Sequence, residues 1–508
     1  MWLSTWTDWA IFFVVVNIIH FLATWRLYQK AGRQAWEAAV PVYNAVVLMD
    51  IIKRPKWWVV MLFLPIIAPV ILLVVWVDFV RCYGKRGIGD ALLVIFTLGF
   101  YLFYLNYVEK PDYTGPEERK ETFISAILFA VILATTVHTY FVQPMIIPTG
   151  SMENTLKIGD ALFVSKNNYG TRLPMTPVAV PFADLFSRNL YVKQLQLPYL
   201  RIPGWESVEK NDIVVFNNPT DVAHPPIDRK ENYVKRCVGT PGDVFEIKDK
   251  QIFINNVQLT HPNDAILQHS AAITFSTPIS EKYLMDQFKI NRTDYQVQNI
   301  GSGYVYNFSG ISQADFDVLS NNPSAVMAEW GSFEEDYKMD GTYPEGYGYN
   351  IDWYGPLTIP RKGETIELNL DNLAHYIKII QQYEDNDLVV RDGKLLLNGV
   401  EANEYTFQQN YYFMMGDNRH NSLDSRFMGF IPESYIIGKP FFLWANLNQA
   451  FGFEPRSGWQ WDRWFTVPNT GNPNKTSYLW VGVLLLVAWF GYDFYRARKR
   501  KQNQGKKQ

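Results

Sequence analysis

PTGSMENTL, residues 148–156, is the stretch from which the fold of this chain can be worked out. It follows almost directly on an apolar run, FISAILFAVILATTVHTYFV at 123–142, which is about as long as a membrane-spanning helix. The stretch places Ser151 and Met152 among small and polar residues. A serine hydroxyl attacks a carbonyl group only when a base takes its proton and donors stabilise the oxyanion. The rest of the chain must therefore be searched for these groups.

Four further apolar runs accompany the one before this stretch. They cover residues 9–25, 57–80, 90–107 and 478–495. A buried core helix is the alternative for each run, but runs near twenty residues favour a membrane helix. The sequence therefore predicts five transmembrane helices.

Lysine and arginine predict how these helices are oriented. The loop 26–56 and the tail RARKRKQNQGKKQ at 496–508 are basic, which is typical of the cytoplasmic side. Residues 143–477 would then lie on the extracytoplasmic side. The loop with Arg81, Lys85 and Arg86 disagrees, because five spans place it outside.

The region between the last two apolar runs reads as mostly β. Short β-rich runs such as DIVVF (212–216), YVKRCVG (233–239) and NYYFMMGD (410–417) alternate with turn residues. The less regular stretch 261–385 reads as an insertion into this domain. We therefore expect a mostly β extracytoplasmic catalytic domain anchored by several transmembrane helices. The whole chain would divide into an N-terminal membrane module 1–122, a transmembrane helix 123–142, a first part of the catalytic β core 143–260, an inserted subdomain 261–385, a second part of the core 386–450, a linker 451–477, a C-terminal transmembrane helix 478–495 and a basic cytoplasmic tail 496–508.

Charge and composition exclude several kinds of partner. The net charge of −3 gives no basic surface for a nucleic acid. The two cysteines, Cys82 and Cys237, lie far apart in different regions, which argues against a disulfide framework and a cysteine metal site. None of the seven histidines forms an HExxH pair, so we expect neither a metal nor another cofactor.

The base for the serine has to be found elsewhere in the chain. Lys235 lies in NYVKRCVGTPGD on a predicted strand with apolar neighbours. A lysine acts as a base when burial lowers its pKa. By periodicity alone, a solvated strand lysine is the alternative. A third polar cluster, GDNRHNSLDSRFMGFIP at 416–432, by itself reads as a structured loop braced by Asp424 and Arg426.

Taken together, these blocks resemble those of bacterial type I signal peptidase. PTGSMENTL resembles its nucleophile block, NDIVVF (211–216) its next strand, YVKRCVGTPGD (233–243) its lysine block and the 416–432 cluster its final block. The four blocks stand in the family's order directly after an apolar run. The departures are Glu153-Asn154 after Ser-Met, Asn211 before the strand and His420 in place of the usual aspartate.

The resemblance implies a role for each matching residue. Ser151 would be the nucleophile and Lys235 the general base. The Ser151 backbone N–H and the Thr149 hydroxyl would form the oxyanion hole, and Ser422 would orient the lysine amine.

Further roles follow from the same blocks. Asp424 and Arg426 would brace the site, and Met152 would lie near the substrate channel. The resemblance implies removal of signal peptides from exported preproteins by cutting after an A-x-A pattern. It also implies that the lipid bilayer and the secretion translocon are partners of the chain. The chain would cross the bacterial plasma membrane several times. The alternative is a catalytically inactive membrane scaffold that keeps the fold.

Overall fold

The structure is a computed structural model that describes residues 6–64, 66–116, 123–180, 187–452, 459–468, 477–478, 480–484, 487–489 and 491–492. The predicted linker 451–477 and C-terminal helix 478–495 lie partly outside these residues, and the predicted tail 496–508 lies wholly outside them. The chain divides into two units. One comprises Met1–Phe141, Thr171–Ile202 and Asp221–Glu231, and the other comprises Val142–Gly170, Pro203–Thr220 and Asn232–Gln508.

The first unit is helical and has an apolar core of its own. Its long first helix is tied to a later turn by one buried amide: Asn106 Oδ1 accepts the N–H groups of Arg26 and Leu27, and its Nδ2 donates to Leu22 O. Satisfying such groups internally is what a membrane-embedded helix requires. The helical elements are α1 (Trp6–Lys30), η1 (Ala35–Ala38), α2 (Tyr43–Ile51), α3 (Trp58–Met61), α4 (Ile67–Arg81), α5 (Ile88–Phe96), α6 (Tyr101–Tyr104), η2 (Leu105–Glu109), α7 (Phe123–Tyr140) and η5 (Ile227–Arg229).

The predicted spans differ in how they fold. Within the described residues, one helix is long and apolar enough to cross a membrane, Thr7–Lys30 in α1. The run 57–80 is broken into α3 and α4, and the run 90–107 bends by 118° between α5 and the α6–η2 segment. If that bent pair is one span, the number rises to two. Five spans therefore remain a prediction.

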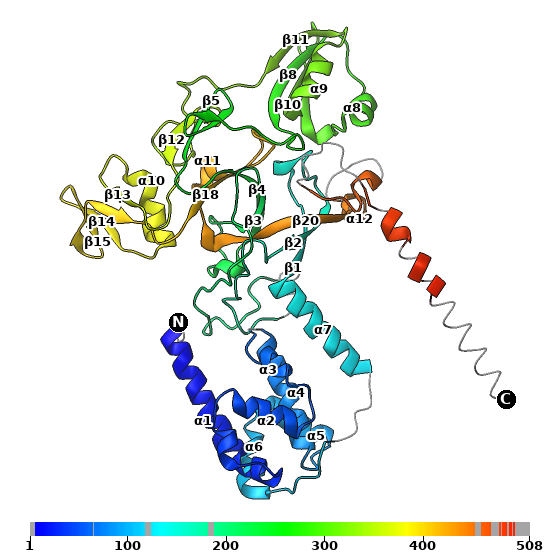
Figure 1. Ribbon diagram of the computed structural model, residues 1–508. Coiled ribbons are helices and arrows are strands. Elements are labelled where there is room, and N and C mark those ends of the chain that lie inside the picture. Colours follow the sequence, from blue (N-terminus) through cyan, green and yellow to red (C-terminus); the bar gives the residue numbers. More distant parts are fainter. Residues whose placement is uncertain are drawn as a thin grey trace, which may run out of the picture. The chain divides into compact units, whose positions relative to one another are not determined.

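The central element of the second unit is an antiparallel sheet of seven strands. Its order is β1-β2-β20-β3-β4-β18-β19. The long strand β20 lies between β2 and β3 (Figure 1). The strands predicted at 212–216, 233–239 and 410–417 are present in this sheet. Its strands are β1 (Val142–Ile146), β2 (Asp160–Ser165), β3 (Ile213–Asn217), β4 (Asn232–Gly239), β18 (Tyr411–Met415), β19 (Ile431–Pro432) and β20 (Ile436–Asn446).

Smaller antiparallel sheets accompany this one in the region that was expected to be mostly β. Two three-strand meanders have tight turns at Asp249-Lys250 and Asp392-Gly393, all with positive φ, as two-residue hairpins require. The smaller sheets contain β5 (Val244–Lys248), β6 (Gln251–Ile254), β7 (Val257–Gln258) and β12 (Tyr354–Thr358); β13 (Thr365–Glu367) with β17 (Glu404–Thr406); and β14 (Leu388–Arg391), β15 (Lys394–Leu397) and β16 (Val400–Glu401).

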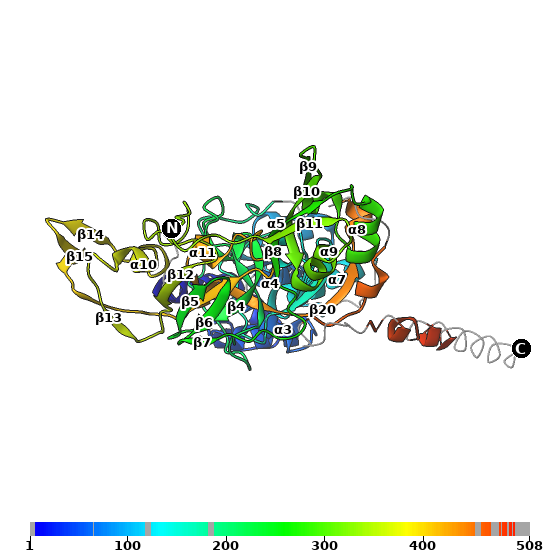
Figure 2. The same ribbon diagram turned by 90° about the horizontal axis from the view of Figure 1, so that it is seen from above.

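A separate four-stranded sheet, β11-β8-β10-β9, falls within the stretch predicted as an insertion. Helix α9 packs on it in both views (Figure 1, Figure 2), and the sheet and its helices bury an apolar cluster of their own. We call residues 268–330 the β8–β11 subdomain. It consists of β8 (Gln268–Phe275), α8 (Glu281–Phe288), η6 (Arg292–Asp294), β9 (Tyr295–Asn299), β10 (Tyr304–Ser312), α9 (Gln313–Ser320) and β11 (Ala325–Trp330).

Short helical turns complete the second unit. They are η3 (Gly150–Met152), α10 (Leu373–Lys378), η7 (Ile379–Tyr383), α11 (Ser425–Met428), η8 (Glu433–Tyr435), α12 (Asn448–Phe451) and η9 (Trp461–Arg463).

Candidate active site

The 148–156 stretch forms a tight turn at the end of a strand. After β1 the backbone is extended at Thr149, and Ser151 lies in the short helix η3. Asn418 fixes this turn, because its N–H donates to Ser151 O at 3.1 Å and its side-chain amide donates to Gly150 O at 3.1 Å. The Ser151 side chain is thus held in a rigid turn, with the residue only 8% exposed.

Lys235 reaches the serine from the middle of the central sheet. It lies on β4, where it pairs with Val214 of β3, and it is 3% exposed. Its Nζ lies 2.5 Å from Ser151 Oγ and donates to Val234 O at 3.1 Å. Two residues 84 positions apart in the sequence therefore form a direct hydrogen bond.

The surroundings of Lys235 favour the neutral amine. Burial lowers the pKa of Lys235 from 10.5 to about 8, and it outweighs the opposing effect of the carboxylates of Asp424 and Asp417. The Arg426 guanidinium lowers this pKa further. About one-tenth of the lysine would be neutral at pH 7, far more than for a solvated lysine.

Next to the lysine lies a buried ion pair that the sequence did not reveal. Arg236 and Asp417 are both fully buried and form two hydrogen bonds of 2.8 and 2.7 Å. Thr155 also donates to Asp417, at 2.6 Å. Burial would raise the pKa of Asp417, but Arg236 and Thr155 outweigh it and hold the pKa below its usual value. The sequence contained one sign of this pair: Arg236 lies on a predicted strand that also carries the apolar residues Val234 and Val238.

Asp424 and Arg426 form a second buried pair. Asp424 accepts two bonds from the Arg426 guanidinium, at 2.9 and 2.8 Å, and one from the Gly416 N–H at 3.1 Å. Arg426 also donates to the carbonyls of Ile351 and Arg419. The pair therefore connects the 416–426 loop to neighbouring backbone. Its bracing role in the site remains a prediction.

The structure shows no contact that corresponds to the roles predicted for three other site residues, within the part of the chain that it describes. Thr149 is exposed, and its hydroxyl does not cap the η3 turn. Met152 is fully buried, and its sulfur accepts the Asp417 N–H at 3.4 Å. Ser422 is buried beside Gly416, where a Cβ would collide with its hydroxyl, but no hydrogen bond joins it to Lys235 in the described part of the chain. The roles of these three residues remain predictions.

His420, the departure noted in the final block, connects the loop to the β8–β11 subdomain and to Asp352. Its Nδ1 accepts the Ser270 N–H at 3.2 Å and lies 2.7 Å from Ser270 Oγ. Because Nδ1 accepts a hydrogen bond, Nε2 carries the proton and donates to Asp352 Oδ1 at 2.8 Å. Within the described residues, no group of three or more His, Cys, Asp or Glu is arranged to hold a metal ion.

Comparison with known proteins separates two parts of the chain. Residues 120–309 and 358–445 match the family described as "Signal peptidase, peptidase S26". Residues 36–116 match a family of unknown function, DUF5684. The unmatched residues between 309 and 358 include α9 and β11.

Individual relatives agree with the first match. The chain is 26% identical over 341 residues to "Signal peptidase I" of Buchnera aphidicola subsp. Schizaphis graminum, covering 65% of this chain and 78% of the relative. It is 23% identical to the protein of that name from Haemophilus influenzae, over 69% of this chain and 76% of the relative. It is 29% identical to the protein of that name from Rickettsia typhi, over 66% of this chain and 84% of the relative. Since the family match alone covers more than half of the 508 residues, the chain belongs to the signal peptidase family, peptidase S26.

Proposed function

We propose that this chain is a membrane-bound serine endopeptidase that removes N-terminal signal peptides from exported preproteins by cleaving after an A-x-A pattern. The observation that carries the proposal is the 2.5 Å contact between Lys235 Nζ and Ser151 Oγ in a site that lowers the lysine pKa to about 8. Family membership and the apolar helix α1 support a substrate that is presented at a membrane.

In the proposed reaction, Ser151 Oγ attacks the carbonyl carbon of the bond to be cut while its proton passes to the neutral Lys235 amine. The Ser151 N–H and the Thr149 hydroxyl would donate to the oxyanion that forms. When the carbon–nitrogen bond breaks, Lys235 gives its proton to the leaving amine, which is the new N-terminus of the mature protein. Water then attacks the ester on Ser151 while Lys235 again accepts a proton. The bond between the carbonyl carbon and Ser151 Oγ breaks, Lys235 returns the proton to Ser151 Oγ, and the signal peptide leaves with a new carboxylate end.

The proposed substrate binds in an extended conformation. Peptides that add a strand beside a sheet gain main-chain hydrogen bonds, and pockets for alternate side chains give specificity. Small pockets one and three residues before the cut would accept alanine and exclude larger side chains.

A pair of matched peptides tests this proposal on the full chain in detergent. One carries Ala at the first and third positions before the cut, and the other carries Phe at the first. We expect cleavage after the last Ala of the first peptide and about a hundredfold lower kcat/KM for the second, because bulk cannot enter the pocket. Equal cleavage of both peptides, or cleavage elsewhere, would contradict the specificity. Cleavage of neither by folded protein would favour the inactive scaffold.

A further inference from the structure

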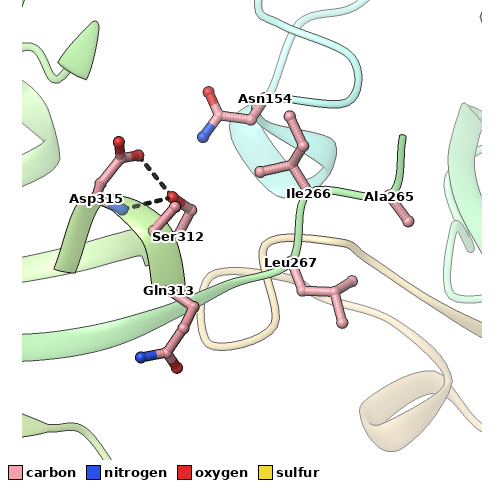
Figure 3. Close-up of a pocket in the computed structure, with 8 residues that line it drawn as sticks. Asn154, Ala265, Ile266, Leu267, Ser312, Gln313 and Asp315 are labelled. Carbon is pink, nitrogen blue, oxygen red and sulfur yellow. Dashed lines mark hydrogen bonds between the residues drawn. The ribbon is translucent and has the colours of Figure 1, made fainter. Parts of the chain in front are cut away.

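A pocket of about 480 Å³ opens between the segment after the nucleophile and the β8–β11 subdomain. Figure 3 shows Asn154, Ile266 and Asp315 arranged around it, with Ser312 beside Asp315. Its walls are mixed. Half of the lining residues are apolar, and the other half carry amide, hydroxyl or carboxylate groups: the apolar ones are Ala265, Ile266, Leu267 and Ala314, and the polar ones are Asn154, Ser312, Gln313 and Asp315. A pocket of this size can hold one or two amino-acid side chains.

Asn418 contacts both the turn that carries the nucleophile and the strand that leads into the pocket. Asn154 follows Ser151 by three residues and lines the pocket. Asn418, which holds the Ser151 turn, lies against Gly310 of β10, where a Cβ would be 2.5 Å from its Oδ1. Ser312, two residues after Gly310, lines the pocket. The pocket is therefore built in a fixed position with respect to the attacking serine.

The chain direction indicates which part of a substrate reaches the pocket. Strand β1 begins directly after the apolar helix α7 and leads to Ser151, and Asn154 lies beyond it. A signal peptide that enters from the membrane would lie along β1 up to the cut. The residues after the cut continue past Ser151, and an extended chain advances about 3.3 Å per residue. Asn154, which lines the pocket, is three residues beyond Ser151, so an extended substrate that follows this segment would bring side chains a few residues after the cut to the pocket.

The chemistry of the pocket favours a basic side chain. The Ser312 hydroxyl donates to Asp315 Oδ2 at 2.7 Å. The Asp315 backbone N–H donates to Ser312 Oγ at 3.2 Å, which caps the start of α9. Within the described residues, no Lys, Arg or His forms a salt bridge with Asp315, and Lys157 acts on it only at longer range. Burial raises the pKa of Asp315, so the carboxylate gains from a cation beside it. Ile266 and Leu267 suit the methylene stem of a lysine or arginine.

We propose that this pocket binds a lysine or arginine side chain of the mature part of the preprotein, two to five residues after the cut, and that Asp315 is its carboxylate partner. The inference rests on the proposed peptidase function and deepens it. Ser312 and Asp315 lie in the stretch between residues 309 and 358 that the family match leaves out, so family membership does not imply this subsite.

The test uses A-x-A peptides that differ only at one position after the cut, with Lys, Ala or Glu there, for each of positions two to five. The full chain in detergent should prefer Lys over Glu by about tenfold in kcat/KM at one position, the size expected for a partly buried ion pair. Asp315→Asn should reduce this ratio below about threefold, and Asp315→Lys should reverse it. Asp286→Asn is the matched control, because Asp286 is an exposed residue on α8 of the same subdomain and does not line the pocket. It should keep the wild-type ratio.

The outcomes separate this inference from the proposed function. If the wild type cleaves the Ala peptides but shows no preference between Lys and Glu, the subsite is overturned and the peptidase stands. A preference that survives in Asp315→Asn also overturns it. Cleavage of no peptide at all rejects the peptidase and the subsite together. If Asp315→Asn fails to fold, Gln313→Lys at the exposed pocket wall replaces it, and an unchanged preference in that variant overturns the inference.

Discussion

Ser151→Ala and Lys235→Met should each lower kcat/KM for an A-x-A peptide by at least about a thousandfold, since each removes one half of a pair that acts as a unit. The double variant should be no slower than either single variant, because the loss of one partner already abolishes the other's contribution. The measurement is peptide cleavage by the full chain in detergent, with product identity checked by mass.

Matched controls come from exposed residues of the same types. Ser309→Ala and Lys362→Met change exposed side chains and should keep the wild-type rate. A Ser151→Ala protein with more than a tenth of wild-type activity would show that the nucleophile is another residue or that a contaminant cuts the peptide.

The lysine variant also reports on the burial of the amine. The folded pKa of Lys235, about 8, lies below the ordinary value of 10.5. Between these two values the unfolded chain binds more protons than the folded one, so the stability of the wild type rises with pH through this window. Lys235→Met removes the titrating group and should lose this part of the rise, which urea unfolding at a series of pH values measures.

Asp417→Ala should lower the free energy of unfolding by about 3–5 kcal/mol, because it leaves the Arg236 guanidinium buried without its ion pair. Both side chains are fully buried, and the remaining Arg236 bond to Asn211 O at 2.8 Å cannot neutralise the charge. Urea unfolding of the full chain, compared at one detergent concentration, gives the difference.

Two comparisons make that result specific. Replacing both partners, as Arg236→Met with Asp417→Leu, should recover much of the loss, because no buried charge is then left alone. Glu401→Ala breaks the exposed pair with Lys394 and should cost no more than about 1 kcal/mol. An Asp417→Ala loss as small as that of Glu401→Ala would mean that the buried pair contributes little.

The parts of the site that could be predicted from the sequence are those with a local pattern. Short β-rich runs with turn residues predicted β3, β4 and β18, which place Lys235 in the middle of a sheet. The order of the blocks predicted that Ser151 and Lys235 act together, and their side chains form a hydrogen bond. Strand periodicity alone favoured a solvated lysine, because it takes no account of the η3 turn, which contacts β4 and places Ser151 against the Lys235 amine.

What escaped prediction depends on contacts between distant residues. The Arg236–Asp417 pair joins positions 181 residues apart. Arg236 stands out as a charged residue among apolar strand residues, but nothing in its stretch points to Asp417 as its partner. The apolar run 90–107 has the length of a span, yet it bends at Gly99, which has φ +85 and lies against the Trp76 ring. Hydropathy counts apolar residues and does not register such a bend.

The measurement that tests the central claim most directly is the pH dependence of kcat/KM for an A-x-A peptide between pH 5 and 10. The claim is that the neutral amine of Lys235 takes the proton of Ser151, and burial lowers the pKa of this amine to about 8. The account predicts that kcat/KM rises about tenfold per pH unit at low pH and levels off above about pH 8. A profile that is already level above pH 7, as a histidine base would give, or one that falls between pH 7 and 9, would contradict it.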